Sequence, residues 1–267
     1  MSSSKKGYNL QQLKGLPTAT EDAYNDDALS SIADAINSGA KWVYNWDSTI
    51  PSFVLDALSA AGISFVPTIW DSSHKVSDAL AQQATPKYIL GFNEPDQSSQ
   101  ANMTTTQVID SWAAVADAAP SGSILVGPAI SDGAWDFMTT VYDGLKSNGY
   151  RFDAFGYHVY RTDLNSFTLS SSTHSIPWMA DRYGVAGVIS EIGFTNWSEV
   201  WPFKDNRMAS IIAALKTFWA SCESSDDVLL YSPFITHGVE AREKSAFNWS
   251  GLTGGNYTPL YKAYASV

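Results

Sequence analysis

The sequence predicts an α/β fold of the (β/α)8 or TIM barrel type, built as a single domain over residues 1–267. Short apolar runs alternate with longer amphipathic stretches about eight times, which is the pattern of a closed parallel barrel. No long linker, charge block or low-complexity tract divides the chain. An open doubly wound sheet is the alternative, but no Gly-x-Gly-x-x-Gly follows the first strand to give the usual nucleotide-binding reason for it.

The short apolar runs predict strands, of which the first is the weakest, at 14–16, 41–45, 64–69, 88–92, 124–127, 154–160, 185–190 and 228–234. The amphipathic stretches predict helices at 26–37, 51–61, 76–84, 105–119, 135–147, 173–183, 206–221 and 258–265. Pro51 suits a first helical position, where the missing N–H costs nothing. Gly39 and Gly62 follow helical runs, where a left-handed residue is favoured.

Composition indicates a chain with a substantial core and no affinity for polyanions. Apolar residues make up 45% and charged residues 16%, which argues against disorder. The net charge of −11 argues against nucleic acid, anionic membranes and polyanionic substrates, and favours a neutral polymer. Cys222 is the only cysteine, so neither an internal disulfide nor a cysteine-type zinc site is available. We expect a monomer that needs neither a metal nor another cofactor.

The first residues contain lysine but no apolar h-region, so they are not an intact signal peptide. The start is then either an intracellular terminus or a replacement for a removed signal peptide, and in the second case we expect residues 1–13 to be a leader or a remnant of one. No apolar run is long enough for a transmembrane helix. Sequons at Asn102, Asn196, Asn248 and Asn256 favour, though weakly, a secreted or cell-wall location.

Polar and aromatic side chains gather where the predicted strands end. In a barrel these positions line one mouth, and here they are Asn45, Trp46, Asp47, Trp70, Asp71, Asn93, Glu94, His158, Tyr160, Glu191 and Phe234. His158 and Tyr160 alternate along one strand, so their side chains point the same way. For Asp71 and Asp96 we expect helix capping rather than chemistry.

Two glutamates stand out in that set. Glu94 and Glu191 each follow a strand-like run, and glutamate is almost never fully buried without a partner or a task. A pair of opposed carboxylates is what glycosidic bond cleavage requires, about 5–5.5 Å apart in retaining enzymes. The alternative is that both are ordinary strand-end residues in surface loops. The intact Asn93-Glu94-Pro95 argues against it, since Asn93 can bind a sugar 2-hydroxyl and Pro95 fixes the chain.

An Asn-Glu pair ending strand four and a glutamate ending strand seven resemble the clan A retaining glycosidases. The segments WVYNW (42–46), FVPTIWD (65–71), ILGFNEPD (89–96), VGPAI (126–130), FDAFGYHVY (152–160) and VISEIGF (188–194) are similar to glycoside hydrolase family 128, whose members are endo- or exo-acting β-1,3-glucanases. The resemblance is looser in the last strand and loosest before Asp26. It departs at Val159, where we expect an aromatic, and at Ser232-Pro233-Phe234, where related chains often have tryptophan.

The resemblance implies that Glu94 is the acid/base and Glu191 the nucleophile. An acid needs a raised pKa, while a nucleophile needs hydrogen bonds that keep it ionised. The substrate-binding candidates are Asn45, Trp46, Trp70, Asn93, Trp135, His158, Tyr160 and Trp197. For Trp46 and Trp70 the alternative is core packing, for His158 it is a satisfied core histidine, and for Trp197 a loop that only covers the barrel edge.

The leading hypothesis is therefore a retaining hydrolase of β-1,3-glucan. Two others stay open: a clan A hydrolase of another neutral polysaccharide such as xylan, mannan or galactan, and a glycan-binding barrel without turnover. Retention of both glutamates argues against the last. No Gly-x-Ser-x-Gly is present to support a serine hydrolase.

Overall fold

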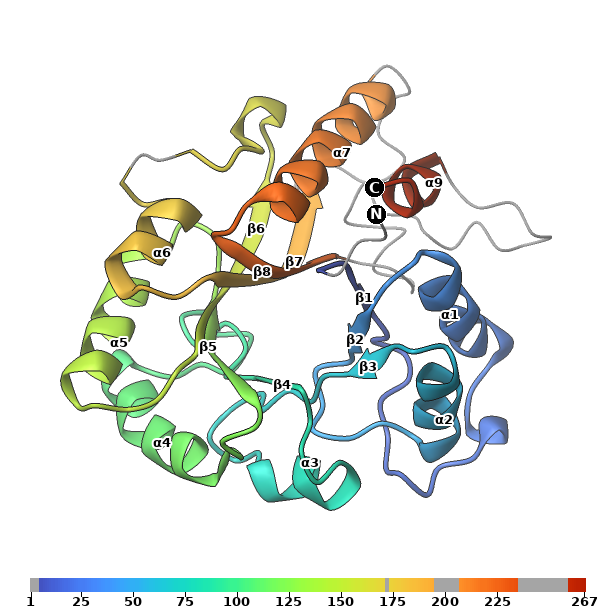
Figure 1. Cartoon of the computed structure of the whole chain (residues 1–267), viewed down its shortest axis with the longest axis horizontal. Helices are drawn as coiled ribbons and strands as arrows, with labels where there is room; N and C mark the ends of the chain where they lie inside the picture. The colour runs from blue at the N-terminus through green and yellow to red at the C-terminus, as the bar shows by residue number, and fades with distance from the viewer. Residues whose placement is uncertain (1–4, 171–172, 195–206, 235–258) are drawn as a thin grey trace.

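Figure 1 shows the computed structural model of the chain, which describes residues 5–170, 173–194, 207–234 and 259–267. Its strands are β1 (Gly7–Asn9), β2 (Trp42–Tyr44), β3 (Ser64–Phe65), β4 (Tyr88–Leu90), β5 (Ile124–Ile130), β6 (Ala154–Arg161), β7 (Gly187–Phe194) and β8 (Val228–Pro233). The helices are α1 (Asp26–Asn37), α2 (Ser52–Ala60), α3 (Val76–Gln82), α4 (Thr105–Ala118), α5 (Trp135–Ser147), α6 (Ile176–Tyr183), α7 (Met208–Ser224) and α9 (Pro259–Ala265), with short 3-10 turns η1 (Glu21–Ala23) and η2 (Leu164–Ser166).

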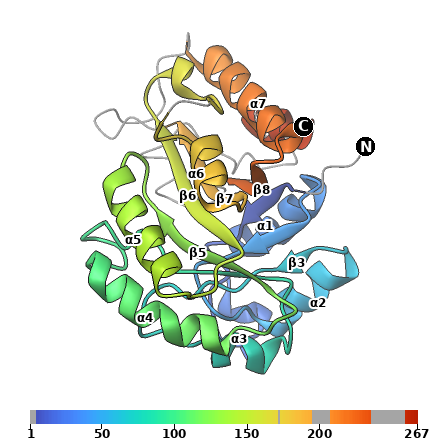
Figure 2. The ribbon, with the colours of Figure 1, turned by 60° about the vertical axis from the view of Figure 1, so that its left-hand side comes forward.

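The strands form two parallel sheets in chain order, β1-β2-β3 and β4-β5-β6-β7-β8. Isolated parallel bridges join the sheets at both edges: Thr68 pairs with Leu90, and Lys6 pairs with Tyr231. Helices α1 to α7 lie outside the strands, as Figure 1 and the rotated view in Figure 2 both show. Parallel neighbours need such crossover helices, and this confirms the predicted α/β class.

The apolar core is divided between the two faces of the strands. Ile89, Leu125 and Ile189 belong to the large cluster that also contains the helix side chains. Leu90, Val126 and Val188, each adjacent in the chain to one of these, belong to a second cluster formed mainly by strand residues. Because successive strand residues point to opposite faces, the helices cover one face and the strands pack against one another on the other.

Helix ends follow the local chemistry of the sequence. Thr104 and Gln107 form a reciprocal capping box at the start of α4. Gly39 and Gly62 follow α1 and α2 with φ of 79° and 69°, as predicted for left-handed residues after a helix. Pro51 lies one residue before the first residue of α2 rather than within it.

The predicted first strand is wrong. Residues 14–16 lie in a connection where Leu16 is 70% exposed, and the strand is instead Gly7–Asn9, whose Tyr8 is buried. Residues 7–9, interpreted above as part of a leader, therefore belong to the sheet, where they pair with β2. Several other strand boundaries also differ by a few residues. β3 ends before Pro67, which lacks an N–H for a sheet ladder, and β7 continues to Phe194, so Glu191 lies inside a strand rather than after one. Among the described helices, none has the length and apolar character needed to cross a membrane.

Candidate active site

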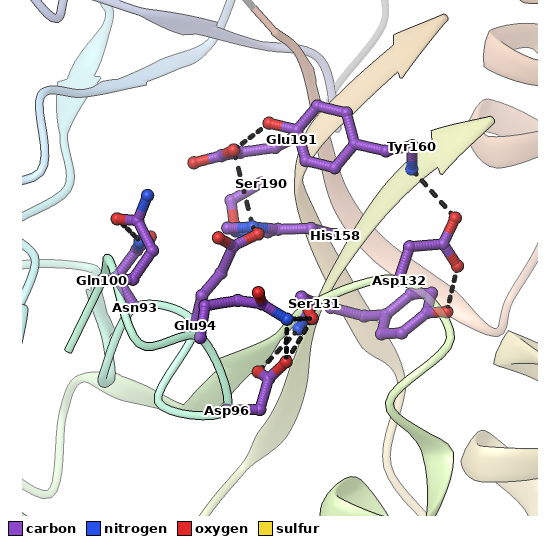
Figure 3. A network of polar contacts seen from close by, with 12 residues as sticks. Asn93, Glu94, Asp96, Gln100, Ser131, Asp132, His158, Tyr160, Ser190 and Glu191 are labelled. Carbon is purple, nitrogen blue, oxygen red and sulfur yellow. Dashed lines mark hydrogen bonds and ion pairs between the residues drawn. The ribbon is translucent and has the colours of Figure 1, made fainter. Parts of the chain in front are cut away.

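Glu94 and Glu191 come together around a buried histidine (Figure 3). One carboxylate oxygen of each glutamate and a ring nitrogen of His158 all lie within 4.8 Å of one another. The exposed fraction of the side chain is 12% for Glu94, 5% for Glu191 and zero for His158. The two carboxylates therefore share one site, as the sequence predicts, although they are 97 residues apart (191 − 94).

Glu191 is held by two hydrogen-bond donors, one from β6 and one from the connection after β2. The Trp46 indole Nε1 donates to Glu191 Oε1 at 2.8 Å, and the Tyr160 hydroxyl donates to Oε2. Burial raises the pKa of Glu191, as does the Glu94 charge, whereas His158 and the two donors lower it; the net direction is upward. The hydrogen bonds expected for a nucleophile are present, and desolvation opposes them.

His158 connects both carboxylates. Its Nδ1 lies 2.8 Å from Glu94 Oε1 and 3.5 Å from Glu191 Oε2, while its Nε2 lies 3.0 Å from Ser190 Oγ. An ionised carboxylate only accepts hydrogen bonds, so Nδ1 carries a hydrogen whenever Glu94 is charged. Burial lowers the pKa of His158, but the charges of Glu191 and Glu94 and the Glu94 hydrogen bond outweigh it, and the pKa is raised.

A β-bulge in β7 lets two consecutive residues contact that histidine. Ile189 pairs with Tyr157, but the next pair is Glu191 with His158, so Ser190 is the extra residue. In a regular strand Ser190 and Glu191 would point to opposite faces. With the bulge, Ser190 Oγ lies beside one ring nitrogen of His158 and Glu191 beside the other.

Two residues of the site have a left-handed backbone, which is rare for residues other than glycine. Trp46 has φ of 60° and Glu94 has φ of 43°. Backbone hydrogen bonds fix the Glu94 turn, since its N–H donates to Ala129 O at 2.8 Å and its carbonyl accepts from the Gln97 N–H at 3.0 Å. Such conformations cost about 1–3 kcal/mol each and concentrate at functional sites.

The two aromatic side chains that donate to Glu191 pack against a third ring, that of Phe234. Phe234 lies 5.7 Å from the ring centre of Trp46 and 5.3 Å from that of Tyr160. Gly193 leaves room for Tyr160, because a Cβ there would lie 3.0 Å from the Tyr160 ring. These contacts fix the orientation of the two rings that donate to Glu191.

The other predicted binding residues are less closely tied to the carboxylates. Asn45 is fully buried: its Nδ2 donates to Leu13 O and Thr49 O, and its Oδ1 accepts from the Asp47 N–H, so it holds a loop. Asn93 is buried beside Glu94, and its Nδ2 donates to Gln100 Oε1 at 3.3 Å.

Two of the tryptophans predicted to bind substrate, Trp70 and Trp135, are half-buried against other rings. Trp135 stacks on Tyr157 at 4.7 Å and on His174 at 6.0 Å between ring centres. Trp70 makes an edge contact with His74, and its carbonyl accepts from the Asn93 N–H. Trp197 lies outside the described residues.

Several site residues escape the sequence patterns. The prediction that Asp96 caps a helix is wrong, because Thr104 caps α4 and the Asp96 carboxylate accepts from the Ser131 N–H and hydroxyl. Asp71 likewise accepts from Ser73 and His74 within a turn. Ser131 and Asp132 form a Ser-Asp-Gly segment with Gly133, which is typical of a turn and gives no sign of a contact with Asp96 or with β6.

The two glutamates and the histidine of the site also have the spacing of metal ligands. In the part of the chain that the structure describes, Glu94, His158 and Glu191 are the one group of this kind. Each already has a hydrogen-bond partner within the site, as expected for acid–base chemistry by the protein's own side chains. We assign no metal to them.

Comparison with known proteins places the chain in a family. The model of the glycosyl hydrolase catalytic core matches residues 22–264. A search of the curated proteins gives no match. Solved structures of the same fold include a variant of a subgroup I family 128 endo-β-1,3-glucanase from Amycolatopsis mediterranei in complex with laminarihexaose, at 23% identity and a TM-score of 0.70 over 99% of both chains.

Two further structures share the fold. One is a subgroup III curdlan-specific exo-β-1,3-glucanase from Blastomyces gilchristii, with 22% identity, a TM-score of 0.69 and coverage of 100% of this chain and 99% of that one. The other is a subgroup II endo-β-1,3-glucanase from Pseudomonas viridiflava, with 22% identity, a TM-score of 0.69 and coverage of 99% and 98%. The resemblance to family 128 indicated by the sequence motifs is thus confirmed. The chain belongs to the glycosyl hydrolase catalytic core family, a family of O-glycosyl hydrolases.

Proposed function

We propose that this protein is a retaining β-1,3-glucanase in which Glu191 is the nucleophile and Glu94 the acid/base. The observation that carries the proposal is the short separation of the two carboxylates, since one oxygen of Glu94 and one of Glu191 lie within 4.8 Å of each other. An inverting enzyme holds its carboxyl groups roughly 6.5–9.5 Å apart to admit a water, whereas a retaining enzyme holds them about 5–5.5 Å apart.

The hydrogen bonds support the division of roles. Glu191 accepts from Trp46 and Tyr160, two neutral donors that stabilise its ionised form and aim its oxygens. Glu94 is the more exposed of the two carboxylates and adjoins an imidazole. A group that must exchange its proton with the leaving oxygen and later with water suits the Glu94 position.

The reaction then proceeds in two displacements. A Glu191 oxygen attacks the anomeric carbon while Glu94 gives its proton to the departing glycosidic oxygen, which leaves a covalent glycosyl ester on Glu191. In the second step Glu94 removes a proton from water, the water oxygen attacks the same carbon, and the ester bond to Glu191 breaks. Both carboxyl groups return to their initial states.

The substrate class rests on the similar folds and on charge. The three structures compared above are β-1,3-glucanases, one of them in complex with laminarihexaose, and the net charge of −11 favours a neutral polymer. Structures of this fold include both endo- and exo-acting enzymes, so the proposal specifies the linkage and leaves the mode of attack to experiment. Since a wall glucan is met outside the cell, we propose a secreted or cell-wall location.

The fold that supports this function is, we propose, one closed (β/α)8 barrel that forms a single catalytic domain and acts as a monomer. The bridges between Thr68 and Leu90 and between Lys6 and Tyr231 support closure, because they join both edges of the two sheets. Backbone hydrogen bonds reinforce each edge, from Ile69 N–H to Leu90 O at 2.9 Å and from Tyr231 N–H to Lys5 O at 3.0 Å.

A digestion time course on linear β-1,3-glucan tests the function. We expect oligosaccharide products whose new reducing end first appears as the β-anomer, as seen by proton NMR before mutarotation. Glu191→Ala should abolish cleavage while oligosaccharide binding survives. Initial release of the α-anomer would exclude the retaining mechanism. Cleavage of xylan, mannan or galactan in preference to β-1,3-glucan would change the substrate, and binding without products would indicate a non-catalytic barrel.

A further inference from the structure

Asp132 is a nearly buried carboxylate in the connection between β5 and α5, with a side chain that is 7% exposed. It touches neither glutamate. Its Oδ2 accepts a hydrogen bond from the Tyr160 backbone N–H at 3.0 Å and pairs with the Arg161 guanidinium, and its Oδ1 accepts from the Tyr157 hydroxyl at 2.5 Å. All of these partners belong to β6 (Figure 3 shows the Tyr160 contact).

The sheet geometry explains why β6 needs such a partner. The last pair between β5 and β6 is Ile130 with Tyr157, but β6 stays paired with β7 as far as Arg161 and Phe194. The final residues of β6 therefore extend beyond β5 and lose the strand on that side. A backbone N–H without a strand partner needs another acceptor, and the Asp132 carboxylate accepts the one from Tyr160.

Tyr160 connects the end of β6, which Asp132 holds, to the proposed nucleophile Glu191. Its ring packs against Phe234 and over Gly193, and its hydroxyl donates to Glu191 Oε2. With the backbone fixed by Asp132 and the ring fixed by packing, the hydroxyl has little freedom to leave the carboxylate. A displacement of about 1 Å in such a donor is enough to reduce a rate about 10²-fold.

Ser131, which precedes Asp132, contacts the turn that carries Glu94. The Ser131 N–H donates to Asp96 Oδ1 at 3.1 Å, its hydroxyl donates to Oδ2, and Asp96 lies two residues after Glu94. Consecutive residues after β5 thus hold the turn that carries Glu94 and the strand that carries Tyr160.

We propose that Asp132 is a positioning residue of the active site, which holds the end of β6 so that the Tyr160 hydroxyl donates to Glu191. This inference deepens the proposed function, and its activity test rests on that function. Asp132 acts through Tyr160 and has no contact with the reacting atoms.

A double-mutant cycle on β-1,3-glucan tests the dependence on Tyr160. We expect Tyr160→Phe to lower kcat/KM about 10²-fold, as loss of a donor to a reacting group does, and Asp132→Ala about 10-fold. Adding Asp132→Ala to Tyr160→Phe should change little further, because the hydroxyl that Asp132 positions is already gone. The matched control is Asp136→Ala, an exposed aspartate in the first turn of α5, which should leave activity unchanged.

Equal losses from Asp132→Ala in the wild-type and Tyr160→Phe backgrounds would overturn the proposal, since they would indicate a general effect on the fold. If Asp132→Ala does not fold, the same cycle uses Asp132→Asn, whose amide oxygen is a weaker acceptor. We expect a loss of about 3-fold that disappears in the Tyr160→Phe background. A loss equal in both backgrounds, or no loss in either, would count against Asp132.

A second readout does not depend on turnover. The Trp46 indole N–H donates directly to Glu191, so its resonance in a protein with ¹⁵N-labelled tryptophan reports ionisation of that carboxylate as pH changes. The indole resonance that is missing from the spectrum of Trp46→Phe is assigned to Trp46. The ionisable groups that face Glu191 or its indole donor are Tyr44, Glu94, His158, Tyr160 and Lys14. Of these groups, the variants of the cycle replace only Tyr160, so the other four are present in every variant.

The Tyr160 hydrogen bond lowers the pKa of Glu191, so its loss must raise the midpoint of this titration. We expect an upward shift in Asp132→Ala and in Tyr160→Phe, and none in Asp136→Ala. An unchanged midpoint in folded Asp132→Ala would refute the proposal. If the protein cleaves no β-1,3-glucan, the proposed function fails, but this titration still decides whether Asp132 acts on Glu191.

Discussion

His158 Nδ1 lies 2.8 Å from Glu94 Oε1, and this contact joins a fully buried imidazole to the carboxylate proposed as acid/base. The same nitrogen lies 3.5 Å from Glu191 Oε2. The charges of both glutamates therefore act on one imidazole, and a change in either charge alters the pKa of His158.

Replacing Glu94 should change the titration of His158. The pKa of His158 is raised although burial lowers it, because of the Glu191 and Glu94 charges and the Glu94 hydrogen bond. Glu94→Gln removes two of these contributions, so we expect the pKa of His158 to fall, as measured by ¹⁵N NMR of the imidazole. Asp71→Asn is the control. Asp71 pairs with the partly exposed His74, so this variant should leave the pKa of His158 unchanged. An unchanged His158 midpoint would show that the Glu94 contact does not hold in solution.

Replacing Glu191 by glutamine should remove activity and stabilise the fold at neutral pH. Burial raises the folded-state pKa of Glu191, so its contribution to stability is present below its unfolded pKa of about 4.3 and is lost as pH rises through the folded value. Glu191→Gln does not ionise. We expect its melting temperature to exceed that of the wild type by a few degrees at pH 7 and to match it near pH 4, with kcat reduced at least about 10³-fold.

Thermal melts across this pH range, with Glu21→Gln as an exposed control, check the stability prediction. A lower melting temperature for Glu191→Gln at pH 7 would mean that the hydrogen bonds from Trp46 and Tyr160 outweigh desolvation.

Trp46→Phe separates the hydrogen-bonding role of this side chain from its packing. The phenyl ring keeps an aromatic contact with Phe234 but cannot donate to Glu191. We expect kcat to fall about 10²-fold and the acid limb of the pH–rate profile to move to higher pH, because the indole bond lowers the pKa of Glu191. A rise in KM with kcat unchanged would instead identify Trp46 as a sugar platform.

Asn45→Ala should affect stability and leave turnover unchanged. The Asn45 amide is fully buried and donates to the carbonyls of Leu13 and Thr49, which lose a donor in the variant. We expect the free energy of unfolding to fall by about 2 kcal/mol, measured by urea denaturation, with kcat/KM of the folded enzyme unchanged. A large rise in KM at wild-type stability would restore the sugar-binding role suggested by the sequence.

Gly193→Ala tests the packing of Tyr160. The added methyl lies 3.0 Å from two ring carbons of Tyr160, so the ring must move by a few tenths of an ångström. We expect lower kcat with KM nearly unchanged, and steady-state kinetics will show it. In the Tyr160→Phe background, Gly193→Ala should have little further effect on kcat. Full activity of Gly193→Ala would show that the Tyr160 ring adjusts without loss of its hydrogen bond.

The sequence predicts the parts of this site that depend on local pattern. Apolar runs place Glu94 and Glu191 on strands β4 and β7 or just after them. The alternation of His158 with Tyr160 predicts that their side chains point the same way, and both contact Glu191. The first strand escapes prediction because Gly7–Asn9 is short and gains its stability from pairing with Trp42–Tyr44, a contact between distant segments.

Other features depend on strand register and on neighbours far along the chain. The bulge at Ser190 arises from how β7 pairs with β6 and β8. The local sequence of Ser190 and Glu191 does not predict it. Asp132 has the local appearance of a turn residue, and its role exists only because β6 extends beyond β5. The full burial of Asn45 likewise follows from loops contributed by Leu13 and Thr49.

The positive φ angles of Trp46 and Glu94 have a consequence for directed evolution. Glycine reaches this backbone region without steric penalty, so selection for heat resistance alone should favour glycine or asparagine at these two positions. Either change would delete the proposed acid/base or a hydrogen-bond donor to the proposed nucleophile. A library screened for survival after heating, and only later for turnover, should therefore accumulate well-folded but inactive clones at residues 46 and 94.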